Sequence, residues 1–226
     1  MLAIVARLVA DTALIAIMAL SGARTLDWKQ AWVLCGVMLI VRVVGAIAVY
    51  RVSPALLRER AKLPVHRDQP AIDKALLIAV VLTGFFALPL LAGLDVFRWH
   101  LLPRPASTVS FLGLALFALG WALKSLALRA NAFATSVVRL QAERDHAVAD
   151  TGVYSIVRHP FYVGTAMVLI GMALWLSSYA AAIFAIVPIA LVVVRLTMEE
   201  RFLRGALPGY DQYATRVPHR LVPGIW

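Results

Sequence analysis

The chain has 226 residues, of which 62% are hydrophobic and only 15% are charged. In a soluble domain about a quarter of the residues are charged. This composition therefore excludes an ordinary soluble protein and indicates that lipid surrounds most of the chain. The net charge of +10 is typical of a membrane protein with basic cytoplasmic loops, so we expect no nucleic-acid partner. The single cysteine excludes an intrachain disulfide and a paired-cysteine metal site, and we expect no metal.

Six apolar segments follow one another along the sequence, and about 20 helical residues cross a bilayer. They are Leu2–Leu20, Ala31–Tyr50, Ala75–Leu94, Val109–Leu128, Phe161–Leu176 and Tyr179–Leu196. The last two are slightly short and are separated only by Ser177 and Ser178, which predicts a tight helical hairpin. The fold class that we expect is an all-α integral membrane protein with about six transmembrane helices.

The basic residues predict the orientation of these segments. If both termini are cytoplasmic, 17 lysines and arginines lie on the inner side and four on the outer side, with Arg42 inside the second segment. Lysine and arginine accumulate in cytoplasmic loops, so we expect both termini in the cytoplasm. The first segment has no basic stretch before it and is interrupted by Arg7 and Asp11, which favours an uncleaved span over a signal peptide.

Several features of the first spans and their loops are chemically informative. Asp11 and Arg42 lie at similar depth in the first two segments, and we interpret them as a structural ion pair, with a substrate path as the alternative. Region 51–74 contains three prolines and alternating charges. It is either a basic loop with a short surface helix or a platform that helps to close an active site or attracts anionic headgroups. Pro89 and Pro188 are expected to kink their spans.

Polar and aromatic residues gather in three stretches near the C-terminus, namely 139–154, 155–164 and 195–213. The short outer turn makes the fifth and sixth helices neighbours, so the start of one lies beside the end of the other. Helical spacing places side chains three or four residues apart on one face. Singly, arginines and tyrosines at helix ends are typical interfacial anchors. The residues that we expect to meet here are Arg158, His159 and Tyr162 with Arg195, Glu199 and Glu200.

Three motifs in this region resemble a known family. They are GVYSIVRHPFYVG (152–164), the Arg-x-x-x-Glu-Glu that begins at Arg195, and GYDQY with a following Val-Pro (209–218). In order and spacing they resemble the isoprenylcysteine carboxyl methyltransferases and their bacterial relatives, which in turn resemble phospholipid methyltransferases. The resemblance covers about residues 139–220. It implies a methyltransferase-like region over 129–226, and the apolar segments before it predict an N-terminal four-helix transmembrane region over 1–128.

The resemblance also implies S-adenosyl-L-methionine as the cofactor, in a pocket formed by the hairpin. Aromatic faces suit the adenine and the cationic sulfur, a glutamate suits the ammonium group or the ribose hydroxyls, and a guanidinium suits a carboxylate acceptor. No Gly-x-Gly-x-x-Gly follows a strand, so we expect helix ends and loops to hold the cofactor. By position, the implied cofactor-binding residues are Gln141, His146, Ala147, Val148, Ala149, Tyr154, His159, Pro160, Phe161, Tyr162 and Glu199, and Arg195 is the implied catalytic, substrate-binding arginine.

The function that we expect is S-adenosyl-L-methionine-dependent methyl transfer to a lipid, or to an amphiphilic or small apolar molecule such as an isoprenylcysteine-like carboxylate. We expect it at the cytoplasmic face of a bacterial inner membrane, with the acceptor entering sideways along a seam beside Gly164, Ala166 or Gly171. Two alternatives stay open: an NADPH-dependent membrane enzyme similar to sterol and steroid reductases, and a non-catalytic membrane scaffold.

Overall fold

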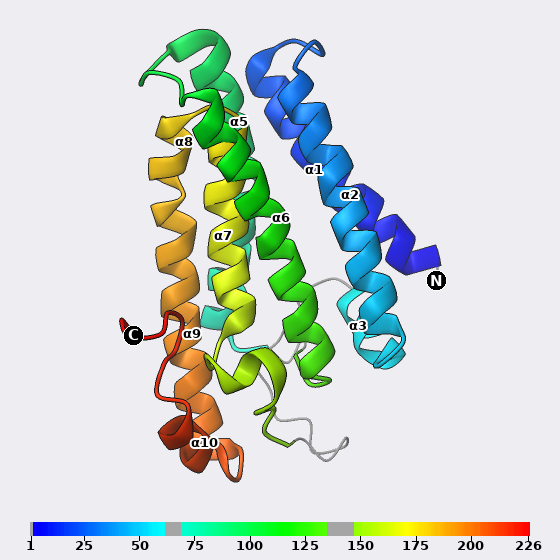
Figure 1. Ribbon diagram of the computed structural model, residues 1–226, viewed down its shortest axis with the longest axis vertical. Helices are drawn as coiled ribbons and strands as arrows, with labels where there is room; N and C mark the ends of the chain where they lie inside the picture. Colours follow the sequence, from blue (N-terminus) through cyan, green and yellow to red (C-terminus); the bar gives the residue numbers. More distant parts are fainter. Residues whose placement is uncertain (1, 62–68, 135–146) are drawn as a thin grey trace.

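The computed structural model describes residues 2–61, 69–134 and 147–226. Every regular element within these ranges is a helix, and the long helices run side by side along the long axis of the molecule (Figure 1). The all-α fold class expected from the sequence is therefore confirmed for the part of the chain that the structure describes.

The first helical hairpin consists of α1 (Leu2–Ala23) and α2 (Lys29–Tyr50). The ion pair expected from the sequence joins these two helices, because Arg42 Nη2 lies 2.7 Å from Asp11 Oδ2. The other carboxylate oxygen of Asp11 lies 2.9 Å from Arg7 Nε. Since a charge inside a span needs a partner, this cluster fixes α1 and α2 relative to each other.

The third span changes its helical pitch along its length. It consists of α4 (Ala71–Val81), the π-helical η1 (Leu82–Ala87), α5 (Leu88–Leu94) and the π-helical η2 (Asp95–Trp99). Proline lacks an amide hydrogen, and its ring clashes with the carbonyl group four residues earlier. Pro89 is the second residue of α5 and lies two positions after the end of η1. The wide helical turn therefore accommodates this proline, which is the irregularity that the sequence predicts.

α6 (Ser107–Ala130) and α7 (Pro160–Trp175) pack closely along their lengths. A Cβ atom on Gly164 would lie 2.7 Å from a backbone carbonyl oxygen of α6, and one on Gly171 would lie 2.5 Å from the amide nitrogen of Phe117. Only the hydrogen of glycine fits at these two positions. Gly164 and Gly171 are therefore wrong as positions of the expected lateral seam, because both face α6 in close contact.

The C-terminal hairpin continues from α7 through α8 (Tyr179–Phe184) and α9 (Ile186–Ala206). The buried Ser178 caps α8, because its Oγ accepts a hydrogen bond of 2.9 Å from the amide nitrogen of Ala181, and it donates one of 2.6 Å to Asp95 Oδ2. This contact holds the turn against the end of the third span. The ring of Pro188 would clash with the carbonyl group of the last residue of α8, which explains the break between α8 and α9.

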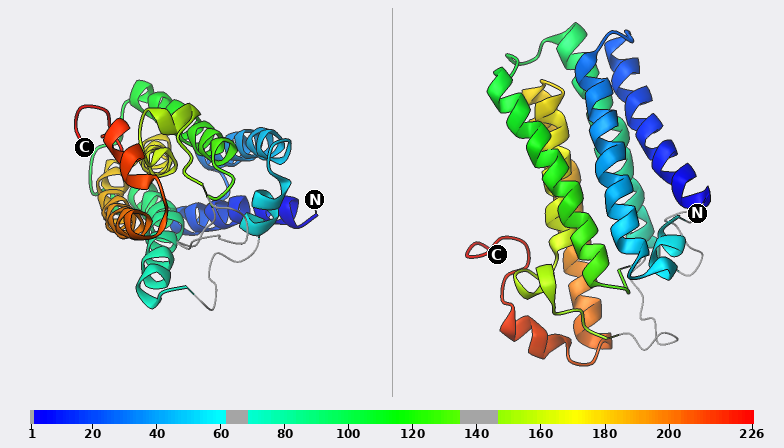
Figure 2. Two further views of the ribbon diagram at one scale, coloured as in Figure 1. Left: turned by 90° about the horizontal axis from the view of Figure 1, so that it is seen from below. Right: turned by 45° about the vertical axis from the view of Figure 1, so that its right-hand side comes forward.

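Seen from the lower end, α2, α6, α7, α9, α4 and α1 follow one another around a common centre, and we call this arrangement the helical ring (Figure 2). α3 (Pro54–Ala61) lies at the lower end of the ring beside α1 and α2, and α10 (Tyr210–Arg216) packs against α9. One buried hydrophobic cluster includes Ile15, Leu34 and Val168. The core therefore connects the N-terminal helices with the C-terminal hairpin.

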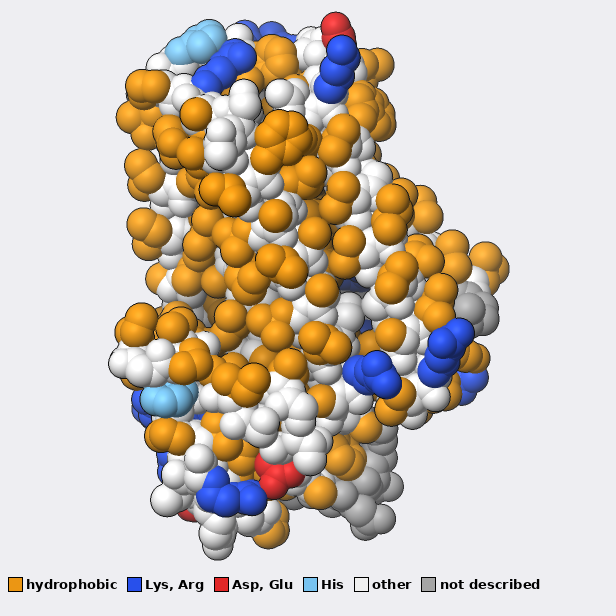
Figure 3. All heavy atoms as spheres, viewed as in Figure 1, with side chains coloured by type: hydrophobic (Ala, Val, Ile, Leu, Met, Phe, Trp, Pro, Cys, Tyr) orange, Lys and Arg blue, Asp and Glu red, His pale blue; other side chains and the backbone are white. Residues whose placement is uncertain are grey.

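Five helical segments of the described chain are long and apolar enough to cross a membrane: Leu2–Ala23, Lys29–Tyr50, Ala71–Trp99, Ser107–Ala130 and Tyr179–Ala206. The helix Pro160–Trp175 is also apolar but has only 16 residues, fewer than the roughly 20 that cross a bilayer. Hydrophobic side chains cover the middle of the visible surface, and charged side chains gather toward its two ends (Figure 3). The chain is therefore an integral membrane protein.

Candidate active site

Residues from the two arms of the hairpin meet at its lower end, as the sequence predicts. Tyr162 Oη donates a hydrogen bond of 2.5 Å to Glu199 Oε2 and accepts one of 2.8 Å from Arg195 Nη1. Tyr162 lies in the first turn of α7, and the other two residues lie one turn apart on α9. The hairpin turn thus joins side chains that are 33 and 37 positions apart in the sequence.

The neighbouring Glu200 has a different environment, because arginines enclose it. Its carboxylate lies 2.9 Å from Arg158 Nη2, 3.2 Å from Arg204 Nη2 and 2.6 Å from Arg220 Nε, and the residue is only 3% exposed. A buried carboxylate is stable when it is paired and hydrogen-bonded in this way. Glu200 therefore anchors the lower end of α9, and Glu199 is the glutamate that lines a pocket.

That pocket has a volume of about 170 Å³ at the lower end of the hairpin, and we call it the outer pocket. Pro160 is not among the described residues that line it; this proline starts α7 instead, where a missing amide hydrogen costs nothing. Gln141 and His146 lie outside the described residues. The predicted site residues that do line the pocket are Ala147, Val148, Ala149, Tyr154, His159, Phe161, Tyr162, Arg195 and Glu199.

Three buried polar atoms of residues that line the outer pocket have no hydrogen-bond partner among the described residues, namely Arg158 Nε, His159 Nε2 and Tyr210 Oη. Glu200 Oε2 lies 3.8 Å from His159 Nε2, which is too long for a hydrogen bond. A buried polar atom without a partner destabilises a protein. His159 Nε2 and Tyr210 Oη, which the Glu200 ion pairs leave without a partner, therefore point to a polar ligand in this pocket.

The residues of the outer pocket fit S-adenosyl-L-methionine. Tyr154, Phe161 and Tyr210 can offer aromatic faces to the adenine and to the sulfonium. Glu199 can accept from an ammonium group or from ribose hydroxyls, while His159 Nε2 and Tyr210 Oη need partners. Burial raises the pKa of Tyr154 to about 12, so its phenol stays uncharged at neutral pH.

The C-terminal segments support this pocket, a role that the sequence motifs did not disclose. The amide nitrogen of His159 donates a hydrogen bond of 3.0 Å to the carbonyl oxygen of Arg220 in the C-terminal tail. Tyr213 Oη of α10 donates one of 2.8 Å to the carbonyl oxygen of Tyr154. Tyr210 and Tyr213, the two tyrosines of the GYDQY motif, therefore belong to the pocket wall.

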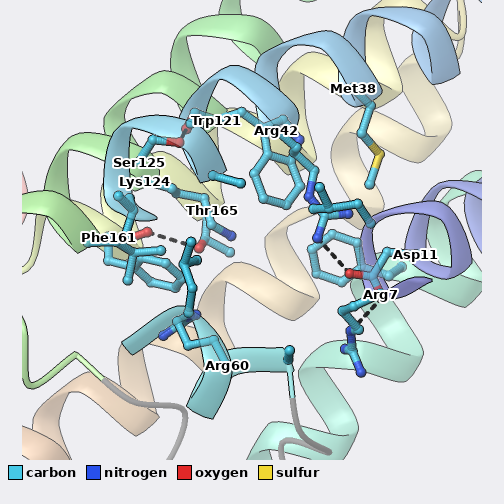
Figure 4. A pocket seen from close by; sticks show the side chains of 18 of the residues that line it. Arg7, Asp11, Met38, Arg42, Arg60, Trp121, Lys124, Ser125, Phe161 and Thr165 are labelled. Carbon is cyan, nitrogen blue, oxygen red and sulfur yellow. Dashed lines mark hydrogen bonds and ion pairs between the residues drawn. The ribbon is translucent and has the colours of Figure 1, made fainter. Parts of the chain in front are cut away.

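A second cavity, of about 310 Å³, lies within the helical ring, and we call it the inner cavity (Figure 4). Its lining is largely apolar and comes from α1, α2, α3, α4, α6, α7 and α9. The two cavities therefore meet, with the more polar one below and the largely apolar one within the ring. The described residues that line both are Arg60, Leu77, Phe161, Tyr162 and Arg195, and we call them the shared wall.

Arg195 lies in the shared wall, and an ion pair with Asp73 balances its charge. Its Nε lies 2.8 Å from Asp73 Oδ1, and its Nη2 lies 3.5 Å from Asp73 Oδ2. Asp73 is 4% exposed and also accepts a hydrogen bond of 2.6 Å from Gln69. Asp73 thus orients the guanidinium. It was not among the site residues expected from the sequence, although an acidic residue at the start of an apolar segment is a signal for a buried partner.

Region 51–74 contributes to both cavities through Arg60. Arg60 Nη1 donates a hydrogen bond of 2.6 Å to the carbonyl oxygen of Ala134, and its Cζ lies 4.6 Å from the centre of the Phe161 ring. Of the two interpretations of this region, these contacts favour a platform that helps to close an active site.

Comparisons with known proteins match the same half of the chain. Residues 108–208 match the phospholipid methyltransferase family. Protein-S-isoprenylcysteine O-methyltransferase B of Arabidopsis thaliana is 33% identical over 113 residues, which cover 49% of this chain and 57% of that protein. Protein-S-isoprenylcysteine O-methyltransferase of Schizosaccharomyces pombe is 31% identical over 108 residues, 46% of each chain. The alignments thus span about half the length of these curated relatives.

The likeness of the fold extends further than the likeness of sequence. The solved structure of the eukaryotic intramembrane Ras methyltransferase ICMT (isoprenylcysteine carboxyl methyltransferase) covers 95% of this chain and 74% of its own, with a TM-score of 0.56 and 21% identity. The N-terminal helices, which the sequence motifs do not reach, therefore share the same fold. The motifs, the relatives and the fold agree: the chain is similar in sequence to isoprenylcysteine methyltransferases over about half of its length, and it shares the fold of the solved isoprenylcysteine carboxyl methyltransferase.

Proposed function

We propose that this protein transfers a methyl group from S-adenosyl-L-methionine to a lipid or other amphiphilic acceptor at the cytoplasmic face of a bacterial inner membrane. The observation that carries the proposal is the shared wall, where the more polar outer pocket meets the largely apolar inner cavity. A water-soluble cofactor fits the outer pocket, and an acceptor with an apolar chain fits the inner cavity. The reactions named for the matched relatives support the same reaction class.

The outer pocket would hold the cofactor through groups of three different kinds. Glu199 would bind the ammonium group or the ribose hydroxyls, and His159 and Tyr210 would gain the hydrogen-bond partners that they lack among the described residues. Tyr154 and Phe161 would border the adenine. When bound, S-adenosyl-L-methionine supplies a methyl carbon that its sulfonium makes electrophilic. The task of the protein is then to align and dehydrate the reactants.

The shared wall would position the atom that receives the methyl group. Tyr162 bonds to Glu199 on one side and to Arg195 on the other, and Asp73 holds the far side of Arg195. This chain of contacts fixes the guanidinium where an acceptor head enters from the inner cavity. Since apolar side chains make up most of that cavity, water is excluded beside the reacting atoms.

Ligand titration of the purified protein in lipid nanodiscs tests this proposal. We expect S-adenosylhomocysteine to bind and NADPH not to bind. Glu199→Gln should lower the affinity for S-adenosylhomocysteine by about tenfold or more, because a hydrogen bond to a charged group is lost. Asp211→Asn is the matched control: it makes the same charge change at an exposed position of the same end, and affinity should not change.

Two outcomes would replace the proposal with its alternatives. Binding of NADPH without binding of S-adenosylhomocysteine would favour a reductase-like enzyme. Binding of neither ligand would favour a non-catalytic scaffold. To identify the acceptor, total lipid extracts can be incubated with the protein and a methyl-labelled donor, and the labelled product can be analysed by mass spectrometry.

A further inference from the structure

The buried side-chain atoms that lack a hydrogen-bond partner among the described residues fall into two groups. Three of them belong to residues that line the outer pocket. The other two are Arg42 Nη1 and Trp121 Nε1, and both of these residues line the inner cavity. Both atoms are hydrogen-bond donors. Since a donor without an acceptor is costly at membrane depth, these two atoms point to a ligand oxygen in the inner cavity.

Arg42 and Trp121 approach each other from neighbouring helices. Gly45 of α2 lies so close to Ser125 of α6 that a Cβ atom on the glycine would overlap the hydroxyl group. One turn earlier along both helices, the Cζ atom of Arg42 lies 4.7 Å from the centre of the Trp121 ring. Figure 4 shows these two side chains next to each other. A guanidinium that stacks on a ring still donates in its own plane, so one ligand group can reach both residues.

The surroundings of Arg42 favour a neutral group over an anion at its free nitrogen. Arg42 Nη2 lies 2.7 Å from Asp11 Oδ2, and the arginine side chain is only 11% exposed. An anion at Nη1 would therefore lie close to the Asp11 carboxylate, and like charges repel each other at short distance. A hydroxyl or an amide group would bring a donor of its own that also needs an acceptor. A carbonyl oxygen accepts two hydrogen bonds and donates none, which matches the two donors.

The pair of Arg42 and Trp121 lies further inside the ring than the shared wall. Lys124 is buried at 7% exposure, and its Nζ lies 4.5 Å from the centre of the Phe161 ring and 4.6 Å from that of Trp121. This lysine thus connects the pair with Phe161 of the shared wall. Trp121 precedes Lys124 by three residues on α6, which is a rise of about 4.5 Å away from the outer pocket. A ligand whose head is at the shared wall therefore passes Arg42 and Trp121 with its apolar part.

We propose that Arg42 and Trp121 form a subsite for a carbonyl oxygen, of a ketone or an ester, within the apolar part of the methyl acceptor. This inference rests on the proposed function and narrows the class of its acceptor. The head that receives the methyl group, a carboxylate included, is independent of this assignment. Arg42 and Trp121 act as positioning residues, because a carbonyl group held by them sets how far the head extends toward Tyr162 and Arg195.

Isothermal titration in phosphatidylcholine nanodiscs, corrected for partition into empty nanodiscs, tests the subsite. The probes are dodecanoate and oxododecanoates that carry one ketone at the fourth, sixth, eighth or tenth carbon. All of them share the same carboxylate, so the ratio of two affinities reports the ketone alone. At one ketone position we expect binding about tenfold tighter than that of dodecanoate, because two buried donors gain an acceptor. Equal affinities at every position would mean that these donors bind no more than a water molecule, and would overturn the proposal.

Matched variants show whether the ketone binds at these two residues. Trp121→Phe removes the indole donor but keeps an aromatic ring beside Arg42, and it should lower the affinity ratio about fivefold. Trp99→Phe makes the same change at an exposed position at the far end of the third span, and it should keep the ratio. Arg42→Lys keeps a positive charge for Asp11 but removes the free guanidinium nitrogen, so it should also lower the ratio. A ratio that neither Trp121→Phe nor Arg42→Lys changes would contradict the subsite.

Two further readouts separate this inference from the proposed function. Neither Arg42 nor Trp121 is among the described residues that line the outer pocket, so the ketone ratio and the affinity for S-adenosylhomocysteine are independent measurements. If the wild type does not bind that ligand, the proposed function fails, and the ketone ratio still decides on the subsite. Labelled product from a lipid extract should carry a carbonyl group within its chain, which the fragments in its mass spectrum locate. A product with a purely hydrocarbon chain would contradict the inference.

Discussion

Tyr162 Oη and Glu199 Oε2 lie 2.5 Å apart, on different arms of the helical hairpin. Tyr162 is also the acceptor for Arg195 Nη1 at 2.8 Å. One phenol thus links the glutamate of the outer pocket with the arginine of the shared wall. Since two charged groups depend on it, the position of each should be sensitive to the loss of this hydroxyl group.

Removing that hydroxyl group is therefore the first test of the site. Tyr162→Phe should lower the affinity for S-adenosylhomocysteine by about tenfold, because Glu199 loses a hydrogen bond to its charged form. Tyr179→Phe, at the opposite end of the hairpin, is the control and should bind like the wild type. Equal affinity of Tyr162→Phe and the wild type, measured by titration, would show that this phenol does not order the pocket.

The two adjacent glutamates should differ in their effects on stability. Glu200→Gln leaves Arg158 buried beside a neutral amide, and breaking a buried pair of this kind costs about 3 kcal/mol or more. Glu199→Gln should affect the free energy of unfolding less and ligand affinity more. Thermal unfolding of both variants in the same nanodiscs measures the difference. A greater loss of stability in Glu199→Gln would contradict the assignment of Glu200 as the anchor and Glu199 as the ligand-binding residue.

The contact between α6 and α7 predicts a strict requirement for small residues. A Cβ atom on Gly171 would lie 2.5 Å from the amide nitrogen of Phe117, so Gly171→Ala must push two backbones apart and should destabilise the protein by about 1–3 kcal/mol. Gly36→Ala is the control, because no atom lies within 4 Å of a Cβ at that position. Its unfolding temperature should stay the same or rise, since alanine is the better helix former.

Much of the site could be predicted because local geometry decides it. The turn at Ser177 and Ser178 forces two apolar helices side by side, which brings Tyr162 to Glu199. A charge in each of the first two spans similarly predicts the pair of Asp11 and Arg42. In the first case the short turn, and in the second the need of a buried charge for a partner, leaves few ways to place the residues.

The remaining contacts depend on the packing of distant helices. Asp73 and Arg195 are 122 positions apart, and no periodicity in either segment relates them. Glu199 and Glu200 are neighbours in sequence, so helical spacing alone does not decide which of them faces the pocket; the resemblance implied Glu199, and α9 turns that residue to the pocket. The burial of Lys124 likewise follows from the arrangement of the whole ring, because the sequence alone is equally compatible with a lysine that extends to the membrane surface.

The buried tyrosines predict a loss of stability at alkaline pH. Burial raises the pKa of Tyr154 to about 12 from its ordinary value of 10.0, and it also raises those of Tyr210 and Tyr213. A group with a higher pKa in the folded state contributes stability below its unfolded pKa and loses it as the pH rises through the folded value. For Tyr154 this window runs from about 10 to about 12.

We therefore expect the free energy of unfolding to fall between pH 9 and pH 11, and to fall less in Tyr154→Phe than in the wild type. Thermal unfolding in nanodiscs at the two values provides the comparison. An identical decrease in both proteins would mean that Tyr154 ionises as readily in the folded state as in the unfolded chain.

The proposed function depends above all on the outer pocket holding the methyl donor beside an acceptor cavity, and a structure of the protein with S-adenosylhomocysteine in a lipid nanodisc is the decisive test. We expect the nucleoside to contact Tyr154, His159 and Glu199, with a new hydrogen bond to His159 Nε2 or Tyr210 Oη. A nucleoside bound anywhere else, with those two atoms still unpartnered, would contradict the proposed function.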